Sequence, residues 1–163
     1  MHVESWRESY PGLVPAAILS SLSIDARTVM WARILSEPSS TTAVFVAEVS
    51  GSIVGFGSCC PQRTESLKTG GYDGEVSALY VLRAFQGRTL GARLLSTMAC
   101  SMQASGMQAA SLWVLRDNTP ARRFYERYGG QVIAEREDRR QEGILFEVAY
   151  GWRDLTDIVR VTS

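Results

Sequence analysis

Histidine is nearly absent from this chain, and that scarcity narrows its chemistry more than any other feature. The 163-residue sequence holds one histidine, His2. A Ser–His or Cys–His nucleophile system needs an imidazole in a fixed position, and we expect a residue so close to the N-terminus not to be held firmly. A metal site with several histidine ligands is excluded. A general base must therefore be a carboxylate, a tyrosine, a cysteine or a relayed water.

The chain also lacks a surplus of charge and any long apolar run. Its 17 Lys and Arg residues balance 17 Asp and Glu residues. Neutrality argues against nucleic-acid binding, because such binding depends on neutralising phosphates with surplus basic residues. No apolar run approaches about 18 residues, and the opening MHVESWRESY lacks the basic and apolar regions of a signal peptide. We therefore expect a cytoplasmic protein with no nucleic-acid and no membrane partner.

The three cysteines predict neither disulfides nor a zinc site. Cys59 and Cys60 are adjacent, a spacing that matches neither a disulfide framework nor a CxxC ligand pair. Free thiols are typical of a reducing cytoplasm. Cys100 lies on the apolar face of a predicted helix, so we expect it in the core. We expect no bound metal.

The order of predicted elements indicates an α/β (α+β) protein that forms a single domain over residues 1–163. Apolar periodicity predicts helices between about 3 and 36, broken at Pro11–Gly12, capped at Ser23 and ended by Pro38-Ser39-Ser40. The remaining expected helices cover 90–106 and 118–128. Strands are expected at 43–49, 53–60, 75–82, 111–115, 131–137 and 144–152, with a polar loop at 61–74 and a charged turn at 138–143.

The segment richest in chemistry is Gln86-Gly87-Arg88-Thr89-Leu90-Gly91, which joins a strand to an amphipathic helix. A helix start presents unpaired backbone N–H groups and a positive dipole end, which together bind phosphate. Arg88 and Arg93 could add charge. A plain strand–helix connection with glycines for a tight turn explains the same residues equally well. A Walker loop is excluded because no Gly-Lys-Ser/Thr follows.

Two runs of residues resemble the Gcn5-related N-acetyltransferase (GNAT) superfamily. LYVLRAFQGRTLGARLL is similar to its acyl-CoA-binding motif, Gln/Arg-x-x-Gly-x-Gly/Ala, and DNTPARRFYERYGG is similar to its Asn-x-x-Ala-x-x-Phe-Tyr segment. Together the two matches cover residues 43–152. The resemblance implies a mixed central sheet with a splayed pair of strands, flanked by helices, here with the family's usual first strand absent.

The resemblance also implies acetyl-CoA as acyl donor, attacked directly by an amine without a covalent enzyme intermediate. Strand residues beside the pantetheine arm would be Leu79, Tyr80 and Val81, one of whose main-chain N–H groups would polarise the thioester carbonyl. The motif residues that would hold the pyrophosphate are Gln86, Gly87, Arg88, Thr89, Leu90, Gly91 and Ala92. Asn118 would contact the cofactor, and the same residue is expected to cap a helix.

Catalytic roles come from the same resemblance. Tyr125 stands where the family commonly places a tyrosine that protonates the leaving thiolate; the other interpretation is a core aromatic. Glu75 begins the central strand, where several members carry a catalytic glutamate; the other interpretation is a solvated strand end. Glu48 and Glu65 are weaker choices for the base. Deprotonation by a relayed water, with no dedicated residue, stays open.

The acceptor is expected to be a small-molecule amine or a peptide amine. An aromatic wall of Trp6, Tyr10, Trp31 and Tyr72 would suit a cationic amine. For Trp6, Tyr10 and Trp31, taken singly, a place in the core of amphipathic helices is the favoured alternative. Two other functions stay open: a catalytically weak CoA-binding sensor or assembly module, and a protein N-terminal acetyltransferase.

The sequence departs from the family pattern at several positions. Thr89 replaces the first glycine of the motif, and we expect a helical backbone there, which a threonine tolerates. Gly130 replaces a larger residue, and Trp113 replaces a glutamate used by the ribosomal-protein acetylating branch, which disfavours that branch. A missing first strand would leave a sheet edge exposed, which predicts a homodimer or another partner contact.

Overall fold

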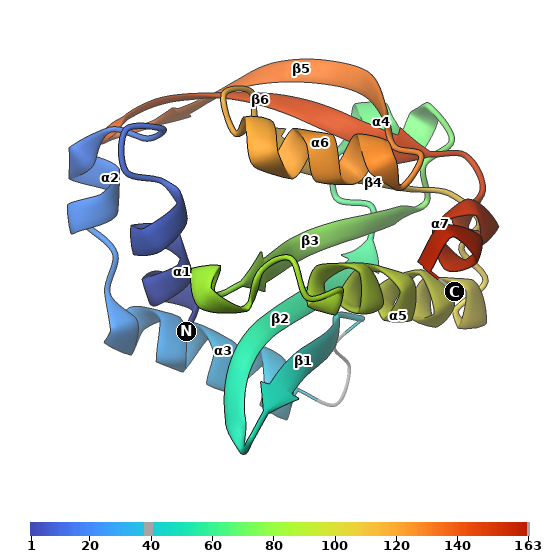
Figure 1. The fold of residues 1–163 in the computed structure, drawn as a ribbon. Coiled ribbons are helices and arrows are strands. Elements are labelled where there is room, and N and C mark those ends of the chain that lie inside the picture. The colour runs from blue at the N-terminus through green and yellow to red at the C-terminus, as the bar shows by residue number, and fades with distance from the viewer. Residues whose placement is uncertain (38–40, 163) are drawn as a thin grey trace.

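The computed structural model describes residues 1–37 and 41–162, with the backbone alone for the last two. One six-stranded sheet runs through the molecule in the order β1-β2-β3-β4-β6-β5 (Figure 1). Its strands are β1 Ala43–Val49, β2 Ser52–Pro61, β3 Gly74–Val81, β4 Ala110–Leu115, β5 Gln131–Arg140 and β6 Gly143–Trp152. The helices are α1 His2–Ser9, α2 Ala16–Ser20, α3 Ile24–Ser36, α4 Glu65–Thr69, α5 Leu90–Ala104, α6 Thr119–Arg127 and α7 Leu155–Thr162, with a 3₁₀ turn, η1, at Arg83–Phe85.

The sheet parts in its middle, between β3 and β4. These two strands form the parallel pair, and they pair only at Gly74–Ala110 and Glu75–Ser111. Beyond Glu75 they diverge, as Figure 1 shows, while β4 stays paired with β6 over six positions. A bulge in the β2–β3 pairing, between Ser58 and Cys59, skips Ser77 and increases the local twist. The predicted mixed sheet with a splayed strand pair is confirmed.

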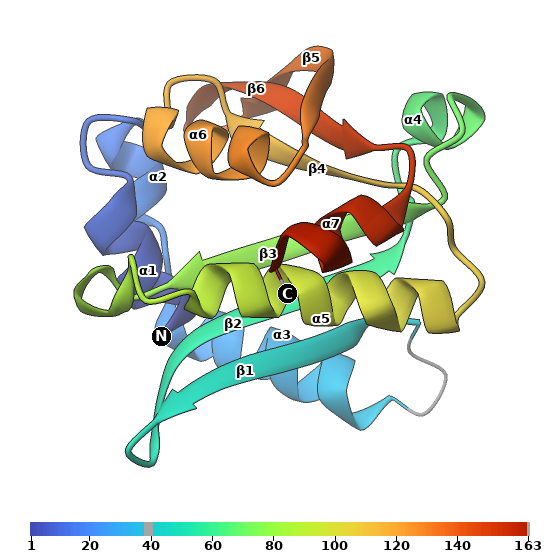
Figure 2. The same ribbon diagram turned by 45° about the vertical axis from the view of Figure 1, so that its right-hand side comes forward.

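Helices cover both faces of the sheet (Figure 2). On one face, α5 buries Leu95, Met98 and Met102 against strand residues such as Val76 and Leu112, and α6 and α7 join the same core. Adjacent residues of a strand point to opposite faces. Gly57 faces Met98 of α5, so its neighbour Phe56 points to the opposite face of the sheet. There the Phe56 ring lies 5.2 Å from that of His2 in α1. The sheet thus separates an α5–α6 face from a face covered by α1 and α3.

The N-terminal helices are confirmed, and Ser23 caps α3 by accepting a hydrogen bond from the Ala26 N–H at 3.1 Å. Residues 1–37 contain no strand, as expected, so β1 and β5 are the edges of the sheet. The expected helix end at Pro38-Ser39-Ser40 lies outside the described residues. No helix within the described ranges is both long enough and apolar enough to cross a membrane.

Several local expectations were wrong. The 61–74 loop contains the five-residue helix α4, which is too short to leave a periodic signal, and the 138–143 turn is largely strand, because β5 runs to Arg140 and β6 begins at Gly143. Cys100 is exposed, since the buried stripe of α5 passes through Leu95, Met98 and Met102 instead. The C-terminal helix α7 was not predicted; it buries Leu155 and Ile158.

Gly130 packs so closely against Trp152 that a side chain at residue 130 would clash with the indole. A Cβ atom at residue 130 would stand 2.8 Å from Trp152 Cζ2 and 3.0 Å from the Tyr125 carbonyl oxygen. The Trp152 indole therefore occupies the space beside residue 130 and leaves no room there for a larger side chain.

Replacing Gly130 by alanine should lower the free energy of unfolding by about 1–3 kcal/mol, because the new methyl group overpacks this contact. Chemical denaturation measures the loss. In the double variant with Trp152→Phe, part of the clash is removed, so the combined loss should be smaller than the sum of the single losses. Additive losses would contradict the proposed contact.

Candidate active site

The loop between β3 and α5 presents a row of free backbone donors. The N–H groups of residues 87–92 have no acceptor within the described part of the chain, as expected at the start of a helix. The loop itself is closed by Gln86, whose side-chain Nε2 donates to the Val81 carbonyl oxygen at 3.0 Å. The Arg88 guanidinium is exposed and lies over the Phe85 ring. The loop therefore concentrates positive potential at the end of the splayed strand.

This region fits an extended phosphorylated ligand. Gly87 has φ +73, and a Cβ there would meet nothing within 4 Å, so its backbone faces open space. Along the adjoining strand, Leu79, Tyr80 and Val81 are half-buried on the part of β3 that no longer pairs with β4. Their β4-facing backbone groups can bind an extended chain as a neighbouring strand would. The residues assigned to acyl-CoA from the motif thus lie together.

The expectation for Thr89 was wrong. Its backbone is left-handed, with φ 63 and ψ −5, not helical. Its hydroxyl donates to the Arg88 carbonyl oxygen at 2.6 Å. The chain enters α5 through two left-handed residues, Gly87 and Thr89, and a β-branched side chain is strained in that conformation by about 1–2 kcal/mol. This strain accounts for the glycine that the family motif has here.

Helix α6 carries the remaining two motif residues. Asn118 caps the helix: its Oδ1 accepts a hydrogen bond from the Ala121 N–H at 3.3 Å. Tyr125 is buried, with its ring 5.9 Å from that of Tyr150 and 6.1 Å from that of Trp152. Burial first, and then the nearby Tyr80 phenol, raise the pKa of Tyr125 above its ordinary value. Tyr125 is therefore both a core aromatic and a neighbour of the splayed strand.

His2 is held firmly, contrary to expectation. Its ring lies within an aromatic cluster that we call the His2 box, made of Trp6, Trp31, Phe56 and Tyr80. The Trp31 indole N–H donates to its Nδ1 at 3.1 Å, so Nε2 carries the proton of the neutral ring. Burial, with smaller contributions from the charges of Arg27 and the chain terminus, lowers the pKa of His2 to about 4.

Three of the four proposed acceptor residues gather at this box. The ring of Trp6 lies 4.8 Å from that of Tyr10 and 6.5 Å from that of Tyr80, and Trp31 packs on His2 and Phe56. Burial raises the pKa values of both Tyr10 and Tyr80. Tyr72 is not brought together with them. It precedes β3, at the opposite end of the strand from Tyr80, where the Arg153 guanidinium lies over its ring.

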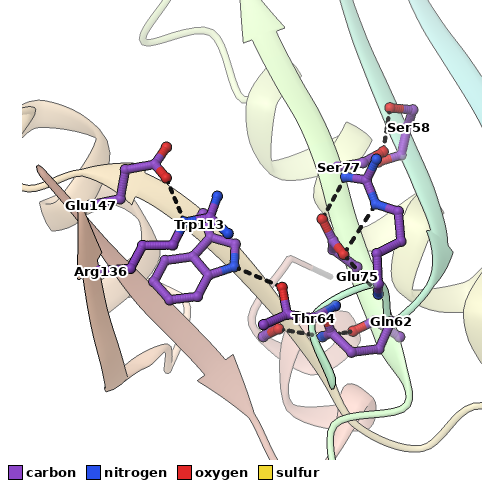
Figure 3. A network of polar contacts seen from close by, with 11 residues as sticks. Ser58, Gln62, Thr64, Glu75, Ser77, Trp113, Arg136 and Glu147 are labelled. Carbon is purple, nitrogen blue, oxygen red and sulfur yellow. Dashed lines mark hydrogen bonds and ion pairs between the residues drawn. The ribbon is translucent and has the colours of Figure 1, made fainter. Parts of the chain in front are cut away.

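Glu75 sits at the point where β3 and β4 begin to part (Figure 3). Its neighbour Val76 packs on the α5 side, so the Glu75 side chain points to the opposite face. It is buried, and its carboxylate accepts three bonds from Arg63: from Nη2 at 2.6 Å, from the backbone N–H at 3.1 Å and from Nε at 3.3 Å. Next to it, the hydroxyls of Ser77 and Ser58 are 2.7 Å apart. Glu75 is therefore not the solvated strand end that the sequence also allowed.

A buried amide closes the bottom of the parting. The Gln62 Nε2 donates to the Ser111 hydroxyl at 2.6 Å and to the Gly74 carbonyl oxygen at 3.2 Å, which ties β2 to both splayed strands. Its Oε1 accepts from the Thr64 N–H. Sequence reasoning missed Gln62 and Arg63, because both lie in a segment predicted to be a loop and nothing local indicates their partners.

The opposite wall comes from β4, β5 and β6. The Trp113 indole N–H donates to the Thr64 hydroxyl at 3.2 Å across the parting, and the Arg136 guanidinium lies 4.1 Å over the Trp113 ring. Arg136 Nε donates to Glu147 at 2.7 Å. Figure 3 shows Trp113, Arg136 and Glu147 on one side and Glu75, Ser77 and Gln62 on the other. Within the described residues, no cluster of three or more His, Cys, Asp or Glu could hold a metal ion.

A mixed sheet parted at one parallel pair, beside a helix start with free amides, defines a GNAT fold. Residues 3–130 match the acetyltransferase (GNAT) family, and the chain belongs to that family.

Relatives agree with this assignment. The chain is 34% identical over 157 residues, 96% of its own length and 86% of the relative's, to the uncharacterized N-acetyltransferase YuaI of Bacillus subtilis (strain 168). Its fold is similar to that of PaiA N-acetyltransferase from Thermoplasma acidophilum in complex with coenzyme A (TM-score 0.68, 18% identity, 92% and 87% of the two chains). It is also similar to that of yncA from Salmonella typhimurium, solved with acetyl-CoA (TM-score 0.59, 20% identity, 83% and 75%).

Replacing Thr89 by glycine should raise the free energy of unfolding by about 1 kcal/mol, because glycine adopts the left-handed conformation without a steric cost. Chemical denaturation measures the change. Thr97→Gly, within α5, is the matched control and should lower stability by about 0.5–1 kcal/mol. Losses at both positions would refute the strain at residue 89.

His2 should make the protein less stable in mild acid. Because the pKa of His2 in the folded state, about 4, lies below its unfolded value, its contribution is complete above about pH 6.5 and falls as the pH decreases toward 4. His2→Phe keeps a ring in the box but removes this titration, so its stability should fall less than the wild type's between pH 7.5 and 4.5. The free energy of unfolding of both proteins is measured by chemical denaturation at each pH. An equal fall between pH 7.5 and 4.5 in the two proteins would show that His2 does not titrate in this way.

Proposed function

We propose that this protein transfers an acetyl group from acetyl-CoA to a primary amine by direct attack on the thioester. One observation carries the proposal: the parting of β3 and β4 leads directly into the amide-lined loop before α5. The parting suits an extended pantetheine arm, and the loop suits a pyrophosphate. The fold similarity to structures containing CoA and acetyl-CoA supports the same donor.

The residues that would hold the donor follow from this placement. The backbone of Leu79, Tyr80 and Val81 would pair with the pantetheine arm, and the N–H groups of residues 87–92, with the exposed Arg88, would bind the pyrophosphate. Asn118 would contact the donor through the amide group that its capping bond leaves free. The bound donor supplies an activated acyl group. A main-chain N–H on the splayed strand would stabilise the oxyanion that develops on the thioester carbonyl.

Glu75 is the proposed base. An alkyl amine with a pKa of about 10.4 is neutral in roughly one molecule in 10³ at pH 7, so its proton must be removed before attack. The two oxygens of a carboxylate offer about four acceptor sites, and Arg63 occupies three. The fourth can accept the proton directly or through a water. The amine nitrogen then forms the new C–N bond, the C–S bond breaks, and the sulfur leaves with the electron pair.

Tyr125 is proposed to assist the leaving sulfur. Because its pKa is raised above about 10 and that of a thiol is about 8.5, complete proton transfer to a thiolate is unfavourable. We therefore assign Tyr125 the donation of a hydrogen bond to the sulfur as negative charge develops there. At neutral pH the phenol keeps its proton and is ready to donate.

A CoA-binding sensor with little catalytic activity is the second candidate. The three bonds from Arg63 to Glu75 favour it, because they leave the carboxylate about one acceptor site for an amine proton. Within the described residues β1 is an edge strand and its Val46 is exposed, which supports a homodimer whether the protein is an enzyme or a sensor.

Glu75→Gln should lower kcat for amine acetylation by about 10²–10⁴-fold, the range for loss of a positioned base. Tyr125→Phe should lower kcat while leaving the Kd for CoA within about twofold, since only the hydroxyl is lost. Release of CoA thiol from acetyl-CoA across an amine panel measures kcat, and calorimetry measures the Kd. Glu65→Gln, on the exposed helix α4, is the matched control and should match the wild type. Full activity of Glu75→Gln favours a relayed water, and binding of CoA without turnover of any amine favours the sensor.

A further inference from the structure

Two ion pairs border the parting on the face opposite α5, and both have the same orientation. In each pair the carboxylate is the less exposed partner and the guanidinium faces solvent. The Glu75 side chain is 7% exposed and its partner Arg63 is 66% exposed. The Glu147 side chain is 12% exposed and its partner Arg136 is 41% exposed. What a ligand meets at this surface is therefore two cations.

Both guanidinium groups are held in place, yet each keeps free donors. Arg63 uses Nε and one Nη2 hydrogen on Glu75, which leaves three of its five N–H groups for another acceptor. Arg136 uses Nε on Glu147, and its flat face is stacked on Trp113. A planar guanidinium that is already fixed binds a carboxylate with little further loss of conformational freedom.

The two cations belong to one surface. Thr64, the residue after Arg63, accepts a hydrogen bond from Trp113, and Trp113 carries Arg136 on its ring. This chain of contacts crosses the parting, as Figure 3 shows for Thr64, Trp113 and Arg136. The surface lies directly beside Glu75, the proposed base, so the reacting amine would be bound next to it.

Charge then selects among amines. An acceptor with two or more ammonium groups and no anion would place its second cation against Arg63 or Arg136. An acceptor that carries a carboxylate beside its amine would place that anion on them instead.

We propose that the acceptor is an amino acid or a close analogue, whose carboxylate is bound by Arg63 and Arg136 while its amine faces Glu75. This inference rests on the proposed acetyl transfer and names the class of acceptor. It distinguishes amino acids from the polyamines and aminoglycosides that share the same amine chemistry.

Pairs of acceptors that differ only by the carboxylate test the proposal: lysine with cadaverine, ornithine with putrescine, and phenylalanine with phenethylamine. For wild-type protein, kcat/KM measured by CoA release should be about 10–100-fold higher for at least one amino acid than for its amine partner. In Arg136→Gln this ratio should fall at least about tenfold, chiefly through KM for the amino acid. Calorimetry with protein saturated in CoA should show the same loss of affinity for the amino acid without any turnover.

Two further variants keep the test decisive. Arg63→Lys retains the charge beside buried Glu75 but loses the forked geometry, so the ratio of kcat/KM for the amino acid to that for its amine partner should fall in this variant as well. It provides the test if Arg136→Gln does not fold. Arg139→Gln removes an exposed cation from the same strand as Arg136, paired with Glu137 instead, and should keep the wild-type ratio.

The outcomes separate the two proposals. Turnover of cadaverine, putrescine and phenethylamine at least as efficient as that of the amino acids would overturn the assigned acceptor class but leave acetyl transfer standing. An equal drop of the ratio in Arg139→Gln would overturn the assigned binding residues. Absence of CoA release with every acceptor, together with normal CoA binding, would overturn the proposed acetyl transfer and the acceptor class with it.

Discussion

The parting of β3 and β4 after Glu75 and Ser111 is the constraint on which the rest of the structure depends. Parallel strands normally stay paired along their length, because each unpaired backbone group costs hydrogen-bonding energy. Here the pairing stops after two positions, and the side chain of Gln62 bonds both strands where it stops. The remainder of β3 has no partner strand on the side that faces β4, and the proposed donor would lie there. A closed sheet would have offered neither the parting nor its two walls.

The chemistry at the parting follows from how charge is buried there. A carboxylate removed from solvent needs a partner, and both the buried Glu75 and the partly buried Glu147 obtain one from an arginine at the surface. Arg63 thereby positions the proposed base and also faces the proposed acceptor. On the same face of β3 as Glu75, the His2 ring packs against the Tyr80 ring. Helix α1 therefore helps to position a residue of the splayed strand. The site therefore draws on elements from the first helix to the last hairpin.

Features that depend on residues close together in the sequence could be predicted, and those that depend on distant residues could not. The loop before α5, the cap at Asn118 and the buried face bearing Tyr125 were predicted, because motif spacing and helical periodicity are local properties. Thr89 was assigned the wrong conformation, since its left-handed backbone is set by how the chain must turn between η1 and α5. Cys100 was placed in the core because an apolar neighbourhood in sequence does not specify which helical face meets the sheet. The firm placement of His2 depends on Trp31 and Phe56, far along the chain, and so left no local signal.

The shortage of histidine, read from the sequence alone, already limited the general base to a carboxylate, a tyrosine, a cysteine or a relayed water, and the balance of charge argued against nucleic-acid binding. The two motifs were enough to indicate the family and to suggest which residues would hold acyl-CoA. Only the tertiary structure decided what borders the proposed acceptor site, because the pairs Arg63–Glu75 and Arg136–Glu147 join residues 12 and 11 positions apart on different strands or loops. Such pairs arise from strand register and burial, which no local pattern encodes. Equal totals of positive and negative charge thus conceal a surface where cations face outward.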